Sequence, residues 1–271
     1  MTAMKLTADG RARVLNNGVP MPLLGLGVWQ LRPGPATEQA VLWAFEAGYR
    51  HVDTAALYRN EESVGAAVRR SGLPREEVFV ATKFHPRDPD PERSIQQSLR
   101  LLGMDYVDLY LWHWPSGNPT RHWAAFERIA GRGQARAVGV SNFGVDGLGA
   151  LLRAAGMPPA VNQVEFSPFE YRRALLEACE RAGVLLEAYS PLTRGRDLRH
   201  PTALAIARRH SRTPAQVLLR WAVQRGIPVI PKSGNRERII ENAQIFDFAL
   251  TDEDMAALDA LDRTRGTGSA H

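Results

Sequence analysis

The sequence His51-Val-Asp-Thr-Ala-Ala-Leu-Tyr58 decides the fold prediction, because it combines a short buried-strand pattern with a polar loop. Asp53 ends the strand pattern, and Tyr58 follows just before a helical pattern at Glu61–Arg70. Lys83 ends the next strand pattern and His113 ends the one after it. The intervals are equal, since 83 − 53 = 30 and 113 − 83 = 30. Polar groups at successive strand ends, one βα unit apart, are typical of a (β/α)8 barrel active site.

Strand and helix patterns alternate along the rest of the chain. Two strand patterns joined by Asn16-Asn17-Gly18 predict an N-terminal β-hairpin that closes or crosses the bottom of the barrel. Barrel strands are expected at 23–28, 50–53, 78–83, 106–113, 135–142, 160–166, 184–190 and 228–231. A short C-terminal helix at 251–261 and a tail follow. Eight units without a linker predict one α/β domain over residues 1–271, a (β/α)8 TIM barrel.

Composition narrows the class of protein. With 271 residues and 44% hydrophobic residues, the chain is long enough to bury a large core. No run of about 18 apolar residues occurs, so no membrane span is predicted. The N-terminus lacks the apolar segment of a signal peptide, and we therefore expect a cytoplasmic protein, which we take to be a monomer. The single cysteine, Cys179, excludes an internal disulfide and is expected to pack in a helix.

The charge pattern argues against a nucleic-acid partner. The net charge is +5 and the pI is near 9.7, but arginines alternate with acidic residues and no run of five or six like charges occurs. We therefore expect a solvated surface. Only three of the 34 basic residues are lysines, and two of these, Lys83 and Lys232, end predicted strands.

Further motifs carry a resemblance to a known family. They are Gly25–Trp29, Arg50–Tyr58, Asn60–Gly65, 108–115, Gly139–Phe143, Asn162-Gln163 and 230–233, with Arg238, Glu241 and Asn242. Over almost its full length the chain resembles the aldo-keto reductases, in particular prokaryotic short-loop members similar to 2,5-diketo-gluconate reductase. The resemblance implies a barrel enzyme that reduces aldehydes and ketones with NADPH/NADP+.

The resemblance also implies a catalytic tetrad of Asp53, Tyr58, Lys83 and His113. Hydride transfer to a carbonyl carbon leaves an alkoxide that must take up a proton. Tyr58 is the expected acid, and Lys83, held by Asp53, is the cation beside it. A charge about 4 Å away is worth about 4 kcal/mol, or about three pKa units, so we expect Lys83 to lower the pKa of Tyr58. Burial opposes this effect. His113 is expected to orient the carbonyl group.

A cofactor site is implied at the strand ends and the loops that follow them. Ser141, Asn142 and Gln163 suit a carboxamide, and Tyr189 offers an aromatic face to a nicotinamide ring. Lys232, Ser233 and Arg238 are the implied 2′-phosphate site, at a strand end that leads into a helix. The full implied set is Gly27, Val28, Trp29, Asp53, Ser141, Asn142, Gln163, Tyr189, Ser190, Leu192, Lys232, Ser233, Arg238, Glu241 and Asn242.

Aromatic residues near the strand ends predict the walls of a substrate pocket. The expected substrate-binding residues are Trp29, Tyr58, Phe84, His113 and Trp114. Trp112 alternates with His113 along its strand, and it faces either the pocket or the helices. The loops after His113 and Tyr189 are short, so we expect an open pocket and a broad preference for small carbonyl substrates.

Three other classes of function fit parts of this residue pattern. A metal-dependent isomerase or hydrolase would use Asp53, His85, His113 and Glu165, but these residues form no short chelating motif, and we predict no metal site. A Schiff-base aldolase would use Lys83 and leave Lys232 and Arg238 without a role. A non-catalytic NADPH-binding barrel remains open, because fold does not fix function.

Overall fold

Eight parallel strands form the barrel predicted from the sequence. The computed structural model describes residues 5–85, 88–115 and 119–264. Neighbouring strands pair in chain order from first to last. The barrel strands are β3 (Leu26–Gly27), β4 (His51–Asp53), β5 (Phe79–Phe84), β6 (Val107–Trp112), β7 (Ala135–Ser141), β8 (Val161–Glu165), β9 (Leu185–Tyr189) and β10 (Val229–Ile230). Each lies inside its predicted range or within one residue of it.

Two isolated bridges join the first and last strands and bring the barrel close to closure. They pair Leu24 with Val229 and Gly27 with Lys232. A Cβ atom on Gly27 would lie 2.9 Å from the carbonyl oxygen of Ile230, closer than real Cβ contacts allow. Gly27 is therefore required by the close approach of the two strands.

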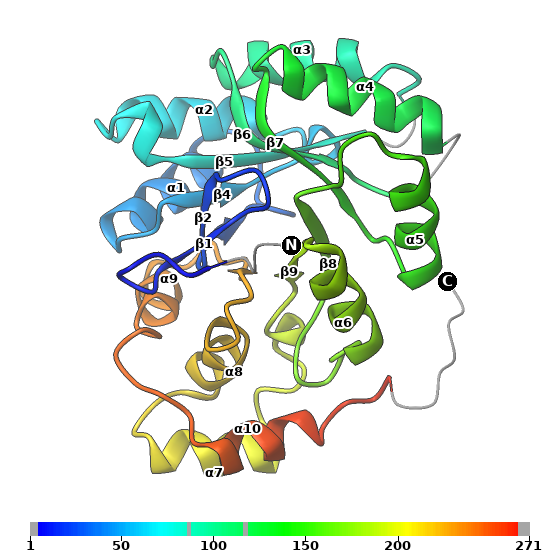
Figure 1. Ribbon diagram of the computed structural model, residues 1–271. Coiled ribbons are helices and arrows are strands. Elements are labelled where there is room, and N and C mark those ends of the chain that lie inside the picture. Colours follow the sequence, from blue (N-terminus) through cyan, green and yellow to red (C-terminus); the bar gives the residue numbers. More distant parts are fainter. Residues whose placement is uncertain (1–4, 86–87, 116–118, 265–271) are drawn as a thin grey trace.

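The N-terminal hairpin contributes to the interior of the barrel. It consists of β1 (Ala12–Val14) and β2 (Pro20–Pro22), which pair antiparallel. Leu15 and Met21 belong to one buried cluster with residues that point inward from β5 to β9, among them Phe79 and Leu109. Figure 1 shows the hairpin in front of the strands, which confirms the predicted place across one end of the barrel.

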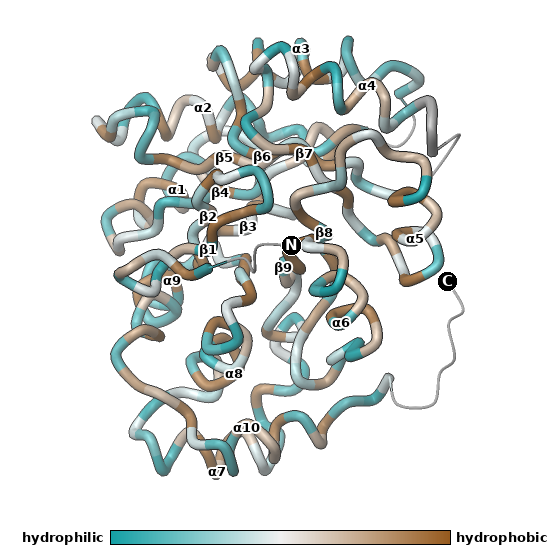
Figure 2. Tube along the Cα trace, in the orientation of Figure 1, coloured by the Kyte–Doolittle hydropathy of each residue, from teal (hydrophilic) through white to brown (hydrophobic). Residues whose placement is uncertain are grey.

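Helices surround the strands and cover their outer faces (Figure 1). Their hydrophobic residues join the outward-pointing strand residues in a second, larger core, and hydrophobic and hydrophilic residues alternate along the helices (Figure 2). The helices are α1 (Pro35–Glu46), α2 (Glu61–Arg70), α3 (Pro91–Leu102), α4 (Pro119–Gly131), α5 (Val145–Ala154), α6 (Arg173–Ala182), α7 (Pro201–Arg209), α8 (Pro214–Val223), α9 (Arg236–Ala243) and α10 (Asp252–Asp259). Short 3-10 turns lie at η1 (Ala56–Tyr58), η2 (Arg75–Glu77) and η3 (Thr193–Gly195).

The crossing of α2 and α3 generates a stability prediction. A Cβ atom on Gly65 of α2 would lie 2.0 Å from the backbone carbonyl oxygen of Leu102. We expect Gly65→Ala to lower the free energy of unfolding by about 1–3 kcal/mol, since the backbone of α3 must move. Gly149→Ala is the matched control, because Gly149 lies inside α5 and a Cβ there would make an ordinary 3.5 Å contact. The control should be neutral or stabilising by up to about 1 kcal/mol. Urea unfolding measures both, and equal effects would contradict the steric argument.

Candidate active site

The four residues expected to form the tetrad come together at the carboxyl ends of β4, β5 and β6. Lys83 Nζ donates hydrogen bonds to Asp53 Oδ1 at 2.5 Å and to the Thr54 carbonyl at 2.8 Å. It also donates to the Tyr58 hydroxyl oxygen at 3.4 Å. The rings of Tyr58 and His113 meet edge to face, with their centroids 5.8 Å apart. The equally spaced residues therefore gather at one site, where Asp53 contacts Lys83 directly and His113 contacts Tyr58.

The loop between β4 and α2 fixes the position of Tyr58. Thr54 Oγ1 donates to Asn60 Oδ1 at 2.7 Å, and Asn60 Nδ2 donates to the Val28 carbonyl at 2.9 Å. Asn60 is fully buried. Because Lys83 donates to the phenol oxygen, the hydroxyl hydrogen of Tyr58 is left for an acceptor at the barrel mouth.

Lys83 is fully buried and its ammonium depends on neighbouring negative charge. Burial acts against the charged form, but Asp53, Tyr58 and Glu187 together raise the pKa of Lys83 above its usual value. Lys83 therefore remains a cation at neutral pH.

The pKa of Tyr58 differs from the expectation. Burial raises it more than the charge of Lys83 lowers it, and Asp53 and Glu187 also raise it. The net shift is upward, so the expected lowering is wrong in direction. The reason is that burial strengthens the penalty on the phenolate while Asp53 offsets part of the Lys83 charge. Tyr58 is consequently a protonated phenol at neutral pH.

His113 is a neutral imidazole. Burial and the charges of Lys83 and His85 lower its pKa to about 3. Nδ1 of His113 is buried and has no hydrogen-bond partner within the described part of the chain. A neutral ring can donate one hydrogen bond to a carbonyl oxygen, but it carries no spare proton to transfer. The geometry therefore favours an orienting role for His113.

Gln163, Asn142 and Tyr189 are linked by hydrogen bonds across β7 to β9. Asn142 Nδ2 donates to the His113 carbonyl and to Ser141 Oγ, and Asn142 Oδ1 accepts from the Tyr189 hydroxyl at 2.9 Å. Gln163 Nε2 donates to Asp53 Oδ2 and to Glu187 Oε2, both at 2.8 Å. These bonds leave Gln163 Oε1 and one lone pair of Asn142 Oδ1 as acceptors.

A second group of predicted residues lies where β10 leads into α9. Lys232 and Arg238 are exposed, and neither makes an ion pair with a described residue. Ser233 Oγ accepts from the backbone N–H of Asn235, which caps the helix. Asn242 is 4% exposed, and its amide makes no hydrogen bond within the described residues.

Some residues predicted to bind the cofactor make contacts within the protein or are buried in it. Glu241 accepts a hydrogen bond from the Thr213 hydroxyl and so ties α9 to the start of α8. Val28 is fully buried, and its backbone groups are used by Asp53 and Asn60. Ser190 and Leu192 are partly buried in the loop after β9.

Two of the residues expected to line the substrate pocket are exposed aromatic residues. A third, Phe84, lies on the other face of its strand. Trp29 is 38% exposed and Trp114 is 46% exposed. Phe84 is fully buried, and its ring packs against His122 and Phe126 of α4. The expectation that Phe84 lines the pocket is therefore not supported, because Phe84 follows Lys83 and so faces the opposite side of the strand. Trp112 likewise packs against Phe126 and faces the helices.

Two residues that were not expected from the sequence lie beside predicted site residues, Glu187 beside Gln163 and Arg194 beside Trp29. Glu187 is fully buried on β9, two residues before Tyr189, and alternation along the strand could have identified it. Arg194 lies over the Trp29 ring, with its guanidinium carbon 5.1 Å from the ring centroid. It is one of three non-glycine residues between 190 and 194 in the left-handed region, with φ of 56°. Nothing in the sequence pattern predicts this contact across loops.

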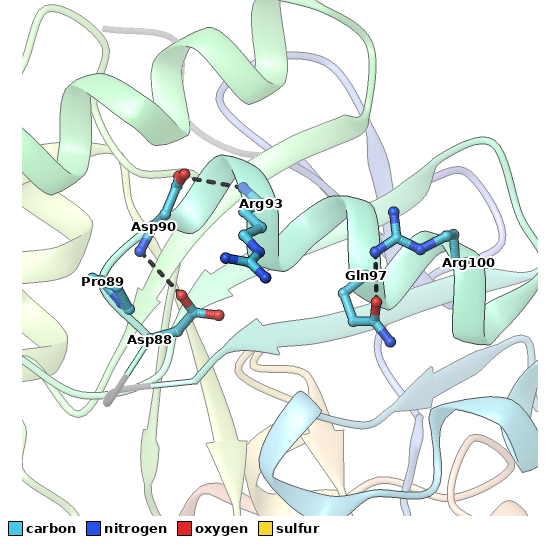
Figure 3. Close-up of a pocket in the computed structure, with 6 residues that line it drawn as sticks. All are labelled: Asp88, Pro89, Asp90, Arg93, Gln97 and Arg100. Atoms are coloured by element: carbon cyan, nitrogen blue, oxygen red, sulfur yellow. Dashed lines mark hydrogen bonds between the residues drawn. The ribbon is translucent and has the colours of Figure 1, made fainter.

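A surface hollow lies away from the tetrad. It has a volume of about 550 Å3 and is formed by the start and outer face of α3, as Figure 3 shows. Its lining consists of Asp88, Pro89, Asp90, Arg93, Gln97 and Arg100. None of the tetrad residues lines it.

No three His, Cys, Asp or Glu side chains in the described part of the chain come together in a way that could hold a metal ion. No described helix combines the length and the apolar character needed to cross a membrane.

Residues 23–263 match the sequence model of the Aldo/keto reductase family. The chain belongs to this family. It is 45% identical over 258 residues to glyoxal reductase of Bacillus subtilis (strain 168), covering 94% of both chains. It is 44% identical to 9,11-endoperoxide prostaglandin H2 reductase of Trypanosoma cruzi (strain CL Brener), covering 94% of this chain and 92% of that protein.

Solved structures agree with the assignment. A crystal structure of an aldo/keto reductase from Brucella melitensis superposes with a TM-score of 0.89 at 40% identity and covers 93% of this chain and 99% of that one. The (β/α)8 fold and the family are therefore both established. As an aldo/keto reductase, the protein is an oxidoreductase of small-molecule carbonyl compounds, and such enzymes generally use NAD(P)H.

Proposed function

We propose that this aldo/keto reductase reduces small aldehydes and activated ketones with NADPH, and that Tyr58 is the proton donor. The observation that carries the proposal is the contact between the buried Lys83 ammonium and the Tyr58 hydroxyl, 3.4 Å apart. Asp53 holds that ammonium at 2.5 Å. A protonated phenol, a fixed cation and a neutral imidazole then face one space at the barrel mouth.

The residues present fit a nicotinamide nucleotide. Gln163 Oε1 is an acceptor that none of the described residues uses, which suits the N–H groups of a carboxamide. Asn242 is 4% exposed and its amide makes no hydrogen bond within the described residues, and Lys232 and Arg238 are cations without described ion pairs. Two cations at the start of α9 suit a phosphate group. When bound, the nucleotide supplies the hydride.

The chain's own residues account for the proton. His113 donates a hydrogen bond to the carbonyl oxygen and so orients it. An alkoxide is a much stronger base than a phenolate, so Tyr58 can protonate it without a lowered pKa. Lys83 then stabilises the phenolate that remains, and Asp53 keeps Lys83 in place.

Replacing the proton donor tests the mechanism. Tyr58→Phe removes only the hydroxyl group, so we expect NADPH binding to persist while kcat falls about 10²- to 10⁴-fold. NADPH oxidation with an aldehyde measures kcat, and fluorescence titration measures NADPH binding. Turnover within about threefold of the parent would show that Tyr58 is not the acid. Absence of turnover in the parent, with NADPH still bound, would favour the non-catalytic barrel.

Cofactor choice is tested on α9. Arg238→Ala should weaken NADPH binding about tenfold or more and leave NADH binding nearly unchanged, because a charge-assisted contact is worth about 1.5–3 kcal/mol. Arg236→Ala is the matched control, since Arg236 lies on the same helix and faces Glu46, 3.6 Å away. The control should alter neither affinity. Equal losses for NADPH and NADH would show that Arg238 does not recognise the 2′-phosphate.

Substrate breadth is tested with a panel of carbonyl compounds. Trp29 and Trp114 are exposed rings at the barrel mouth, and such walls hold ligands mainly by apolar contact. One methylene then gives only about 1–3 kcal/mol of discrimination. The two relatives are named for different substrates, and the similarity to the glyoxal reductase supports small dicarbonyls as substrates.

We expect aromatic aldehydes and dicarbonyls to be among the better substrates and bulky sterols to be poor. The measurement is kcat/KM for aliphatic, aromatic and dicarbonyl compounds and for sugars. A single compound more than about 10⁴-fold better than all others would point to a specific polar pocket and contradict this proposal.

A further inference from the structure

A second carboxyl group lies buried beside the tetrad and is not used by the proposed reaction. Glu187 is fully buried, and it is paired in register with Gln163 on the neighbouring strand β8. Gln163 Nε2 donates one hydrogen to Glu187 Oε2 and the other to Asp53 Oδ2, both at 2.8 Å. Gln163 therefore links Glu187 directly to the carboxylate that holds Lys83.

The other oxygen of Glu187 faces a buried histidine. Glu187 Oε1 lies 3.7 Å from His51 Nε2, and both side chains are fully buried. Neither atom has a hydrogen-bond partner among the described residues. Two unpartnered polar atoms facing each other in the interior are costly unless one proton is held between the two groups.

The charges around this pair point to a neutral state. Burial and the charge of Asp53 raise the pKa of Glu187 to about 8, against the effects of Gln163 and Lys83. Burial and the charge of Lys83 lower the pKa of His51 to about 3, against the effect of the Pro22 carbonyl. The titratable groups that face Glu187 are thus His51 and Asp53 on β4, Lys83 on β5 and Tyr58 on η1.

We propose that Glu187 is a positioning residue that holds a proton in the barrel interior and presents a neutral carboxyl group to Gln163. This inference rests on the proposed function. The carboxyl group accepts a hydrogen bond from Gln163 Nε2. This bond fixes the Gln163 amide so that its Oε1 is directed toward the proposed cofactor site. Its neutrality also keeps Asp53 as the only negative charge directly paired with Lys83.

The consequence for Tyr58 has a definite sign. Below pH about 8 Glu187 is protonated, and the Lys83 charge acts on Tyr58 without a second carboxylate. Above that pH Glu187 becomes negative and raises the pKa of both Tyr58 and Lys83. Tyr58 is then a weaker acid, so carbonyl reduction should decline as the pH rises through about 8.

The first experiment observes the proton without any substrate or cofactor. Infrared difference spectra of the ligand-free parent protein are recorded during a pH titration. A protonated carboxyl band should disappear with a midpoint near pH 8 and be missing in Glu187→Gln. If no band titrates between pH about 6 and 10 in the folded parent, the inference is overturned, whether or not any variant folds.

The second experiment uses pH profiles of kcat/KM for carbonyl reduction. Glu187→Gln keeps an acceptor for Gln163 and cannot ionise, so its alkaline decline should move up by about one pH unit or more. Glu61→Gln is the matched control, because Glu61 is also buried and its pKa is also raised, but it bonds to Thr82 outside the Gln163 network. The control should decline at the parent's pH. An unchanged profile in folded Glu187→Gln would overturn the inference.

The orienting role is measured separately by NADPH affinity. Glu187→Leu removes the acceptor, so NADPH binding should weaken about three- to tenfold at pH 7, while Glu187→Gln should bind as the parent does. Equal affinities for Leu and Gln variants would overturn the orienting role. Absence of NADPH-dependent reduction in the parent at every pH would instead contradict the proposed function and leave the infrared result to decide the inference.

Discussion

The buried charge of Lys83 is the constraint on which the site depends. An ammonium with no exposure is costly unless its donors are satisfied and its charge is balanced. Asp53, the Thr54 carbonyl and the Tyr58 hydroxyl accept its three hydrogen bonds. These acceptors lie in β4 and the loop after it, so the ammonium can be buried with all three bonds only when β4 and β5 pair in the correct register. Burying the Lys83 ammonium and forming this part of the barrel therefore depend on each other.

The barrel separates an apolar interior layer from a polar one. On β5, the inward-pointing Phe79 and Ala81 belong to the apolar cluster, and Lys83 follows at the next inward position. On β9 the same alternation leads from Leu185 to Glu187. The hairpin residues Leu15 and Met21 close the apolar layer from the other end. The polar layer therefore lies between this apolar layer and the barrel mouth. The apolar layer keeps water from the polar groups on that side, which strengthens each electrostatic interaction among them.

Sequence periodicity was sufficient to predict which residues lie at the strand ends, but not the hydrogen-bond network between the strands. Side chains alternate between the two faces of a strand, so Lys83 points inward while Phe84 packs against α4. The same rule, applied to the sequence, would have excluded Phe84 from the predicted pocket. The same rule would have drawn attention to Glu187. The link from Glu187 through Gln163 to Asp53 joins β9, β8 and β4, and no local pattern contains it. The direction in which the pKa of Tyr58 shifts could not be predicted from the sequence either, because it depends on burial and on charged groups from three strands.

The raised pKa of Tyr58 bears on the direction of catalysis. On the proposed mechanism, reduction requires the phenol, whereas oxidation of an alcohol requires the phenolate. Tyr58 is a protonated phenol at neutral pH, and burial and the Asp53 carboxylate raise its pKa further, so nearly all molecules are ready for reduction and few for oxidation. The overall equilibrium is unaffected, since a catalyst cannot alter it. The protein determines only the fraction of molecules whose Tyr58 has the protonation state that each direction requires. A buried phenol beside the Lys83–Asp53 ion pair is almost entirely protonated, which favours proton donation.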